Sequence, residues 1–328
     1  MKVAYVFHQN NKYTYAADTI ALGFKRVFLD IGAEFRFFNT AKLSKLGFEK
    51  LKLRLYDPDL IFTSMENIHL LPLDSLKQKK LVLWGQFYTP CNYEEQLHAI
   101  TAETKSLLNK YKDKHDILVW SQHDDDINDQ FFSEYEKELC LKFIQLLHGA
   151  DKTLFLPPLA QPTHDFIWIG NIWHRKTRYN ATIEPLKKDY PNFWEFTEHA
   201  RLSPDEILAK QLYRQSYFAP NIHTDAQVQY RILINERVFS SSIQGAFQIC
   251  DNPLARKYFS EEELIIAQHV ENYREILTYF KNHPKERLNM INRMTKKILK
   301  EHTYHHRVYE IFRAYGIHSP SLLSHLAS

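Results

Sequence analysis

The sequence predicts an α/β protein built from two doubly wound, Rossmann-like domains. Short apolar segments alternate with amphipathic ones along the chain, and this alternation is typical of parallel strands covered by helices on both faces. The alternation restarts after a proline-rich segment at 156–162. A length of 328 residues suits two domains, each large enough to bury its own core.

In the first half, the apolar segments predict strands at 3–7, 34–38, 60–63, 80–84, 117–120 and 152–156. The segments between them predict helices at 16–29, 43–56, 93–111 and 134–147. Helical spacing is clearest in 16–29, where Ile20, Phe24, Val27 and Phe28 fall on one side.

In the second half, strands are expected at 166–170, 193–197, 217–222 and 246–250. Helices are expected at 178–189, 204–215, 231–242, 270–281, 284–304 and 305–315. We therefore expect an N-terminal domain at 1–160 and a C-terminal domain at 161–304. Residues 305–328 would form a C-terminal helix that can pack back on the first domain.

Composition excludes several classes of protein. A net charge of +3 argues against nucleic-acid binding. Three cysteines without metal-site or disulfide spacing argue against a secreted scaffold. No apolar run reaches the length of a membrane span, and the N-terminus does not resemble a signal peptide. We expect a cytoplasmic enzyme whose membrane association is at most peripheral; its oligomeric state is left open.

Two such domains facing each other would form a cleft at the carboxyl ends of their sheets, where ligands bind in these folds. In the second domain, four segments follow strands or begin helices there. Their candidate ligand-binding residues are Gly170, Asn171, Arg178, Asn221, His223, Arg237, Ser240, Gly245 and Glu263. Glu263 would accept hydrogen bonds from a ribose diol of the ligand, and the others would lie near its anionic part. Glycine would allow close approach, whereas arginines and helix N-termini would bind the anion.

Ordinary structural roles compete with each of these assignments. Arg178 also suits a solvated loop, and a histidine at a strand end is commonly structural. Gly245 is explained by a helix that ends just before it. Glu263 belongs to an acidic run typical of a helix start.

The first domain offers three candidates for a general base, namely His8, Glu66 and Asp124. Asp124 and Asp126 also form an Asp-x-Asp pattern that can chelate a cation carrying a diphosphate. A helix cap explains the same pattern.

The second half resembles the spore-maturation CgeB-like branch of the group 1 glycosyltransferases, over residues 166–313. The matching segments are FIWIGN, the helix start at Arg178, YFAPNIH, RVFSSSIQGAFQICD and YFSEEELII. The closing segment has a His-Thr-Tyr-x-x-Arg pattern at 302–307.

This resemblance implies a GT-B fold and transfer of a sugar from a nucleotide-diphosphate donor to an acceptor hydroxyl of a glycan, glycoconjugate or protein. It implies that Arg178, Asn221, His223 and Arg237 contact the diphosphate or the sugar, and that Glu263 lies near the ribose. It implies no cofactor and no metal, because helix N-termini and basic residues would neutralise the departing diphosphate.

Ser240 stands where the family has a glutamate that orients the donor. Ser240, Glu236 or Glu263 would take over this role. Alternatively, turnover is lost, and the chain is a catalytically silent nucleotide- or sugar-binding protein or a partner subunit.

Overall fold

The computed structural model describes residues 1–8, 16–45, 47–85, 100–122, 133–197, 211–229 and 233–327. The chain divides into two compact units, each treated by itself below. Among the described residues, unit 1 contains 1–8, 17–147 and 307–327, and unit 2 contains 148–306 together with residue 16. The expected mixed α/β class with two parallel sheets is confirmed.

Unit 1 is built on a six-stranded parallel sheet with the order β2-β1-β3-β4-β5-β6. Its strands are β1 (Lys2–Phe7), β2 (Glu34–Asn39), β3 (Leu60–Ser64), β4 (Lys80–Trp84), β5 (Asp116–Ser121) and β6 (Lys142–Gln145). Its helices are α1 (Ala16–Asp30), α2 (Thr40–Lys45), α3 (Gly47–Tyr56), α4 (Ala102–Tyr111), α6 (Ser133–Leu139), α13 (Tyr304–Ala314) and α14 (Pro320–Ala327). The 3-10 helices η1 (Met65–Leu70) and η2 (Leu73–Ser75) follow β3. The predicted apolar side of α1 is confirmed, because its four residues are at most 1% exposed.

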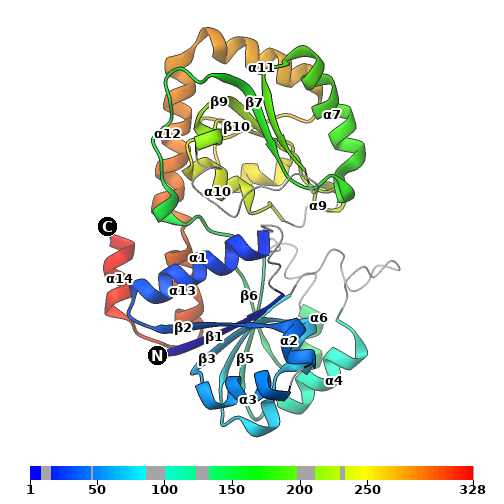
Figure 1. Ribbon diagram of the computed structural model, residues 1–328, viewed down its shortest axis with the longest axis vertical. Coiled ribbons are helices and arrows are strands. Elements are labelled where there is room, and N and C mark those ends of the chain that lie inside the picture. Colours follow the sequence, from blue (N-terminus) through cyan, green and yellow to red (C-terminus); the bar gives the residue numbers. More distant parts are fainter. Residues whose placement is uncertain are drawn as a thin grey trace. The chain divides into compact units, whose positions relative to one another are not determined.

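Unit 2 is built on a five-stranded parallel sheet with the order β11-β10-β9-β7-β8. Its strands are β7 (His164–Ile169), β8 (Phe193–Phe196), β9 (Ser216–Asn221), β10 (Gln248–Cys250) and β11 (Ile265–Ile266). Its helices are α7 (Lys176–Asp189), α9 (Asp225–Gln229), α10 (Arg237–Ile243), α11 (Val270–Asn282) and α12 (Pro284–Glu301), with 3-10 helices η3 (Lys152–Leu154), η4 (Trp173–Arg175) and η5 (Pro253–Lys257). Figure 1 labels most of the α-helices and strands of both units along the chain.

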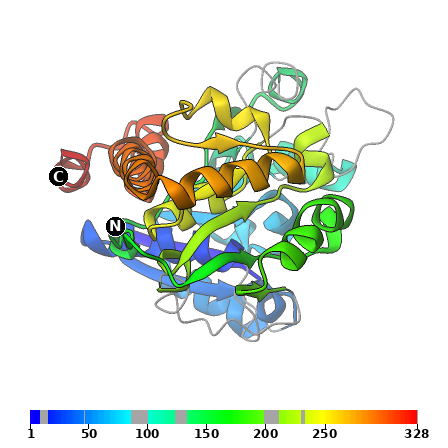
Figure 2. The ribbon, with the colours of Figure 1, turned by 90° about the horizontal axis from the view of Figure 1, so that it is seen from above.

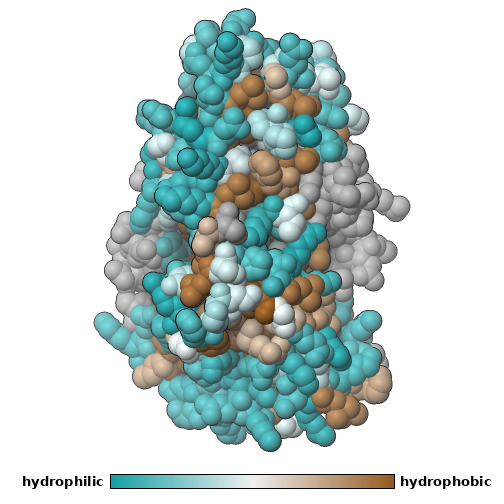
Figure 3. All heavy atoms as spheres, turned by 90° about the vertical axis from the view of Figure 1, so that its left-hand side faces the viewer, coloured by the Kyte–Doolittle hydropathy of each residue, from teal (hydrophilic) through white to brown (hydrophobic). Residues whose placement is uncertain are grey.

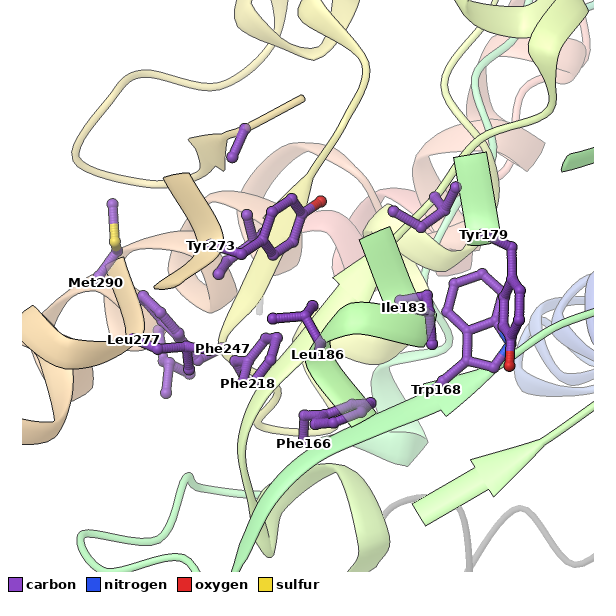
Figure 4. Packing of buried hydrophobic residues seen from close by; sticks show 14 residues of the cluster. Phe166, Trp168, Tyr179, Ile183, Leu186, Phe218, Phe247, Tyr273, Leu277 and Met290 are labelled. Carbon is purple, nitrogen blue, oxygen red and sulfur yellow. The ribbon is translucent and has the colours of Figure 1, made fainter. Parts of the chain in front are cut away.

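The sheet of unit 2 buries aromatic side chains against α7 and α11. Figure 4 shows Phe166, Trp168 and Phe218 from the sheet packed with Tyr179 of α7 and Tyr273 of α11. A second cluster, which includes Ile167 and Ala219, forms from the alternate strand positions, as the two-residue period of a strand requires. Figure 2 shows α11 lying across the sheet, with α12 seen almost end-on. On the face drawn in Figure 3, hydrophilic side chains predominate and apolar groups appear in separate small patches.

The two sheets share one strand order. Numbered within its own unit, each sheet reads 2-1-3-4-5 from one edge, and unit 1 adds a sixth strand. In both units the order therefore reverses between the first and third strands, β1 and β3 in unit 1 and β7 and β9 in unit 2. Ligands of doubly wound sheets bind outside the carboxyl ends of the strands at this reversal.

Two predicted elements are wrong. The helix predicted at 134–147 ends at Leu139, because Cys140 adopts a positive φ of 53°. Residues 142–145 then pair with β5 as β6, so strand pairing overrides the local helical pattern. The strand predicted at 152–156 is the single turn η3, capped by the Asp151 side chain, which accepts a hydrogen bond from the backbone N–H of Thr153.

Other predicted helices differ in their bounds. The helix predicted at 43–56 is two helices, α2 and α3, and the helix predicted at 231–242 begins only at Arg237. Helix α4 begins at Ala102 after the cap Thr101. The predicted residues 93–99 and 204–210 lie outside the described part of the chain. The C-terminal helix expected at 305–328 is two helices, α13 and α14.

Candidate functional site

The candidate site lies at the carboxyl edge of the sheet of unit 2. Because parallel strands end at the same edge, the residues after β7, β9 and β10 come together there. Gly170 and Asn171 follow β7, Asn221 ends β9, and Asp251 follows β10 directly. The structure therefore brings together segments that are some 80 residues apart in the chain, as 170 and 251 show.

His223 is fully buried, and both of its ring nitrogens are hydrogen-bonded. Nδ1 lies 2.7 Å from Oδ1 of Asp251, and Nε2 accepts the backbone N–H of Asn235 at 3.0 Å. Because Nε2 is an acceptor, the neutral ring carries its proton on Nδ1, which donates to the carboxylate. Burial lowers the pKa of His223 below its ordinary value. His223 thus ties the end of β9 to β10 and to the start of α10 as an uncharged group.

Asp251 connects three elements through one buried carboxylate. Besides the His223 ring, Oδ1 accepts the backbone N–H of His223 at 2.9 Å, and Oδ2 lies 3.1 Å from Nη1 of Arg178. Nε of Arg178 lies 3.2 Å from Oδ1 of Asp225 in α9. The charge of Arg178 is therefore balanced by two carboxylates within the protein.

Arg237 at the start of α10 is held differently. Its guanidinium lies over the ring of Trp168, 5.2 Å from the ring centroid. It also packs against Gly170, where an added Cβ would lie 2.5 Å from Nη2. Nη1 is buried, and no described residue accepts a hydrogen bond from it. Within the described residues Arg237 is thus a cation fixed by packing, with a donor still free.

A buried amide network holds the segment before α10. Asn221 donates to Oε1 of Gln248 at 3.0 Å and accepts from Nδ2 of Asn235 at 2.8 Å. Gln248 in turn donates to the carbonyl oxygen of Val238 at 2.9 Å. Oδ1 of Asn235 is buried and accepts no hydrogen bond from a described residue. A free acceptor and a free donor therefore lie two positions apart in the chain, on Asn235 and Arg237.

The other candidates of unit 2 are more ordinary. Ser240 is partly buried, whereas Ser241 and Ser242 are buried and bonded within the fold. Gly245 has a φ of 79° just after α10, as the helix-end explanation requires. The Glu263 side chain accepts the backbone N–H of Ser260 at 2.8 Å and so closes its own turn.

Two of the first-domain candidates, His8 and Glu66, are exposed. His8 follows β1 and Glu66 lies in η1 after β3, so both lie at the strand reversal of unit 1. A role for either residue as a general base stays a prediction. Asp124 lies outside the described residues.

Sequence reasoning missed Asp251, Trp168 and Asn235 as site residues. Asp251 ends a predicted strand, which was a usable signal, but its partners could not be read from the chain. Trp168 lies inside a strand, and Asn235 lies in a segment that was predicted to be helical.

One group in the described part of the chain has the residue types of a metal site: His223, Cys250 and Asp251. It does not fit a resident metal, because both nitrogens of His223 are engaged and Asp251 is paired with Arg178. Burial and the neighbouring Asp251 carboxylate also raise the pKa of the Cys250 thiol and oppose the thiolate that a metal requires.

Comparison with known proteins agrees with this fold. Residues 152–313 match the protein family described as glycosyl transferase-like. No curated protein matches the sequence.

Similar solved structures include Anabaena Alr3699/HepE in complex with UDP-glucose, with 10% identity, a TM-score of 0.57, and coverage of 96% of this chain and 99% of that one. An alpha-glucosyltransferase in complex with UDP has 11% identity and a TM-score of 0.60, with coverage of 96% and 100%. An alpha-glucosyltransferase in complex with UDP and a 13-mer DNA has 12% identity and a TM-score of 0.61, with coverage of 96% and 100%. At these identities the likeness shows the fold.

Among the described helices, none is both long and apolar enough to cross a membrane. The sequence prediction of a GT-B fold is confirmed, and the family match falls on the unit that carries the buried Asp251 network. The chain thus has the GT-B fold and carries a glycosyl transferase-like segment at residues 152–313.

Proposed function

We propose that unit 2 binds a nucleotide-diphosphate sugar with the diphosphate on Arg237, and that the sugar passes to an acceptor hydroxyl presented by unit 1. The observation that carries this proposal is the buried Nη1 of Arg237, which has no acceptor among the described residues. The solved structures with UDP-glucose and UDP support a nucleoside diphosphate as the ligand.

Arg237 suits the charge that develops when the diphosphate departs. A guanidinium that packs on Trp168 and is partly shielded from water interacts strongly with an anion. Gly170 lets the guanidinium lie against the backbone, and Oδ1 of Asn235 is available to accept from a hydroxyl of the donor. Arg178 contributes less charge, because Asp251 and Asp225 already balance it.

We propose that the transfer needs no bound metal, since a guanidinium supplies the positive charge. The acceptor is proposed to be a glycan, a glycoconjugate or a protein, and not nucleic acid. We further propose that the chain belongs to the CgeB-like branch and acts in the cytoplasm; the motifs quoted above support that branch.

The test is to incubate the protein with a panel of nucleotide sugars and to measure release of the nucleoside diphosphate, with and without EDTA. We expect release from at least one donor, at a rate that EDTA does not change. Binding of a nucleotide without release from any donor would overturn the enzyme and favour a silent binding protein.

For the base, His8→Ala and Glu66→Ala are to be compared in the same assay. If one of them activates the acceptor, its loss lowers kcat by about 100-fold or more and leaves nucleotide affinity unchanged. If kcat of both variants equals that of the wild type, neither residue is the base.

A further inference from the structure

Helix α3 exposes a row of large apolar side chains. Phe48 is 64% exposed, Leu51 39% and Leu55 73%. Ten large hydrophobic side chains in the described part of the chain are similarly exposed, and three of them lie on this single helix. Single exposed apolar residues are ordinary on a protein surface, but three on one helix form a patch that calls for a partner.

The spacing makes these residues one face of the helix. Positions i, i+3 and i+7 lie on the same side of an α-helix, and they correspond to 48, 51 and 55. The opposite side is already used by the fold, because Leu53 and Tyr56 are buried. Helix α3 is thus apolar toward the protein and apolar again toward solvent.

The same segment is strongly basic. Residues 40–56, which include α2 and α3 of Figure 1, contain Lys42, Lys45, Lys50, Lys52 and Arg54 but only one acidic residue, Glu49. Its net charge of +4 exceeds the net charge of the whole chain, which is +3.

Most of these cations have no ion-pair partner in the part of the chain that the structure describes. Lys52 pairs with Glu49 at 2.8 Å and lies over the Phe48 ring. The other four basic side chains form no ion pair with a described residue, and those of Lys42, Lys45 and Arg54 are exposed. An anionic partner would therefore meet cations beside an apolar row.

We propose that the outward face of α2 and α3 docks on an anionic lipid surface. Phe48, Leu51 and Leu55 enter the boundary between headgroups and acyl chains, and the flanking lysines and arginine bind the lipid phosphates. A helix with a basic polar side and an apolar row is the pattern that binds in the plane of a membrane interface. A nucleic acid would meet the cations but leave the apolar row in water.

The experiment is co-sedimentation of the purified full-length protein with vesicles of phosphatidylcholine alone or with 30% phosphatidylglycerol, at low and high salt. We expect binding to the phosphatidylglycerol vesicles, little binding to phosphatidylcholine, and weaker binding at high salt because the charges are screened.

Two double variants test the two components of the face. Phe48→Ser with Leu55→Ser removes the most exposed apolar groups, and Lys50→Glu with Arg54→Glu reverses two charges. Each is expected to lower vesicle binding by about tenfold or more. The matched controls are Leu323→Ser in α14 and Lys188→Glu with Lys285→Glu, which change exposed residues elsewhere and should bind as the wild type does.

Three results would overturn the proposal. The first is no binding to anionic vesicles, and the second is vesicle binding that the α3 variants do not weaken. The third is self-association or DNA binding that the α3 variants abolish while their lipid binding stays unchanged. UDP binding is to be measured on every variant as well. A variant that loses lipid binding but still binds UDP then separates this proposal from the proposal of sugar transfer.

Discussion

The two units share a strand order but differ in the residues that lie after the strand reversal. In unit 2 the residues at the ends of β9 and β10 form a buried network in which Asp251, His223 and Asn221 have defined partners. In unit 1 the comparable positions hold His8 and Glu66, which are both exposed. The same topology thus carries a hydrogen-bonded edge in unit 2 and exposed side chains at the two described positions of unit 1.

The largest expected effect is on the network of unit 2. Asp251→Ala leaves the buried Nδ1–H of His223 and one backbone N–H without an acceptor. We expect the free energy of unfolding to fall by about 2–4 kcal/mol, because unpaired buried polar groups are costly. Urea denaturation measures it.

Asp225→Ala is the matched control for that variant. It removes the other carboxylate partner of Arg178, but Asp225 is half exposed, so the loss should stay below about 1 kcal/mol. Equal losses for the two variants would show that the edge of unit 2 is no more organised than an ordinary surface.

The second largest effect is expected on the affinity for a nucleotide. Arg237→Ala should weaken UDP binding by about 10- to 100-fold in calorimetry, because a charge-assisted hydrogen bond to phosphate is lost. Arg178→Ala should change the affinity less, since two carboxylates already balance that guanidinium. The reverse ranking would assign the diphosphate to Arg178.

Buried histidines give each unit its own pH dependence. His115 in unit 1 accepts the backbone N–H of Lys79 at 3.2 Å, and burial lowers its pKa as it lowers that of His223. Both rings therefore bind a proton less readily in the folded chain than in the unfolded chain, where histidine titrates at about pH 6.5. The stability they contribute is therefore present above about pH 6.5 and is lost as the pH falls below it.

The slope should reach at most about 1.4 kcal/mol per pH unit for each histidine. His115→Asn and His223→Asn should each flatten the curve of unfolding free energy between about pH 6.5 and 5. If neither variant changes the slope, other groups govern the acid sensitivity.

The fold and the strand-end positions of the site could be predicted because both depend on short, local sequence patterns. Apolar alternation marks strands, and the residue after a parallel strand must lie at the carboxyl edge, so Gly170 and Asn221 were placed correctly in the fold. Pairings were not predictable, because Asp251 meets Arg178 across 73 positions only through the order of the sheet. Strand β6 was missed because its four residues pair at a sheet edge after an abrupt helix end at Cys140.

The smallest expected effect comes from replacing a glycine with alanine, a change that can be made in each unit. Gly170→Ala places a Cβ 2.5 Å from Nη2 of Arg237, which is the flexible end of a side chain and can move. The fold should tolerate this, while the displaced guanidinium lowers UDP affinity by about threefold to tenfold. Gly47→Ala in α3 meets nothing within 4 Å and should leave the affinity unchanged, with stability equal or slightly higher. The backbone at Gly170 is not in the left-handed region, so alanine adds no backbone strain there. A large loss of stability in Gly170→Ala would therefore mean that the contact between Gly170 and Arg237 stabilises unit 2 and does not serve to position a cation for the donor.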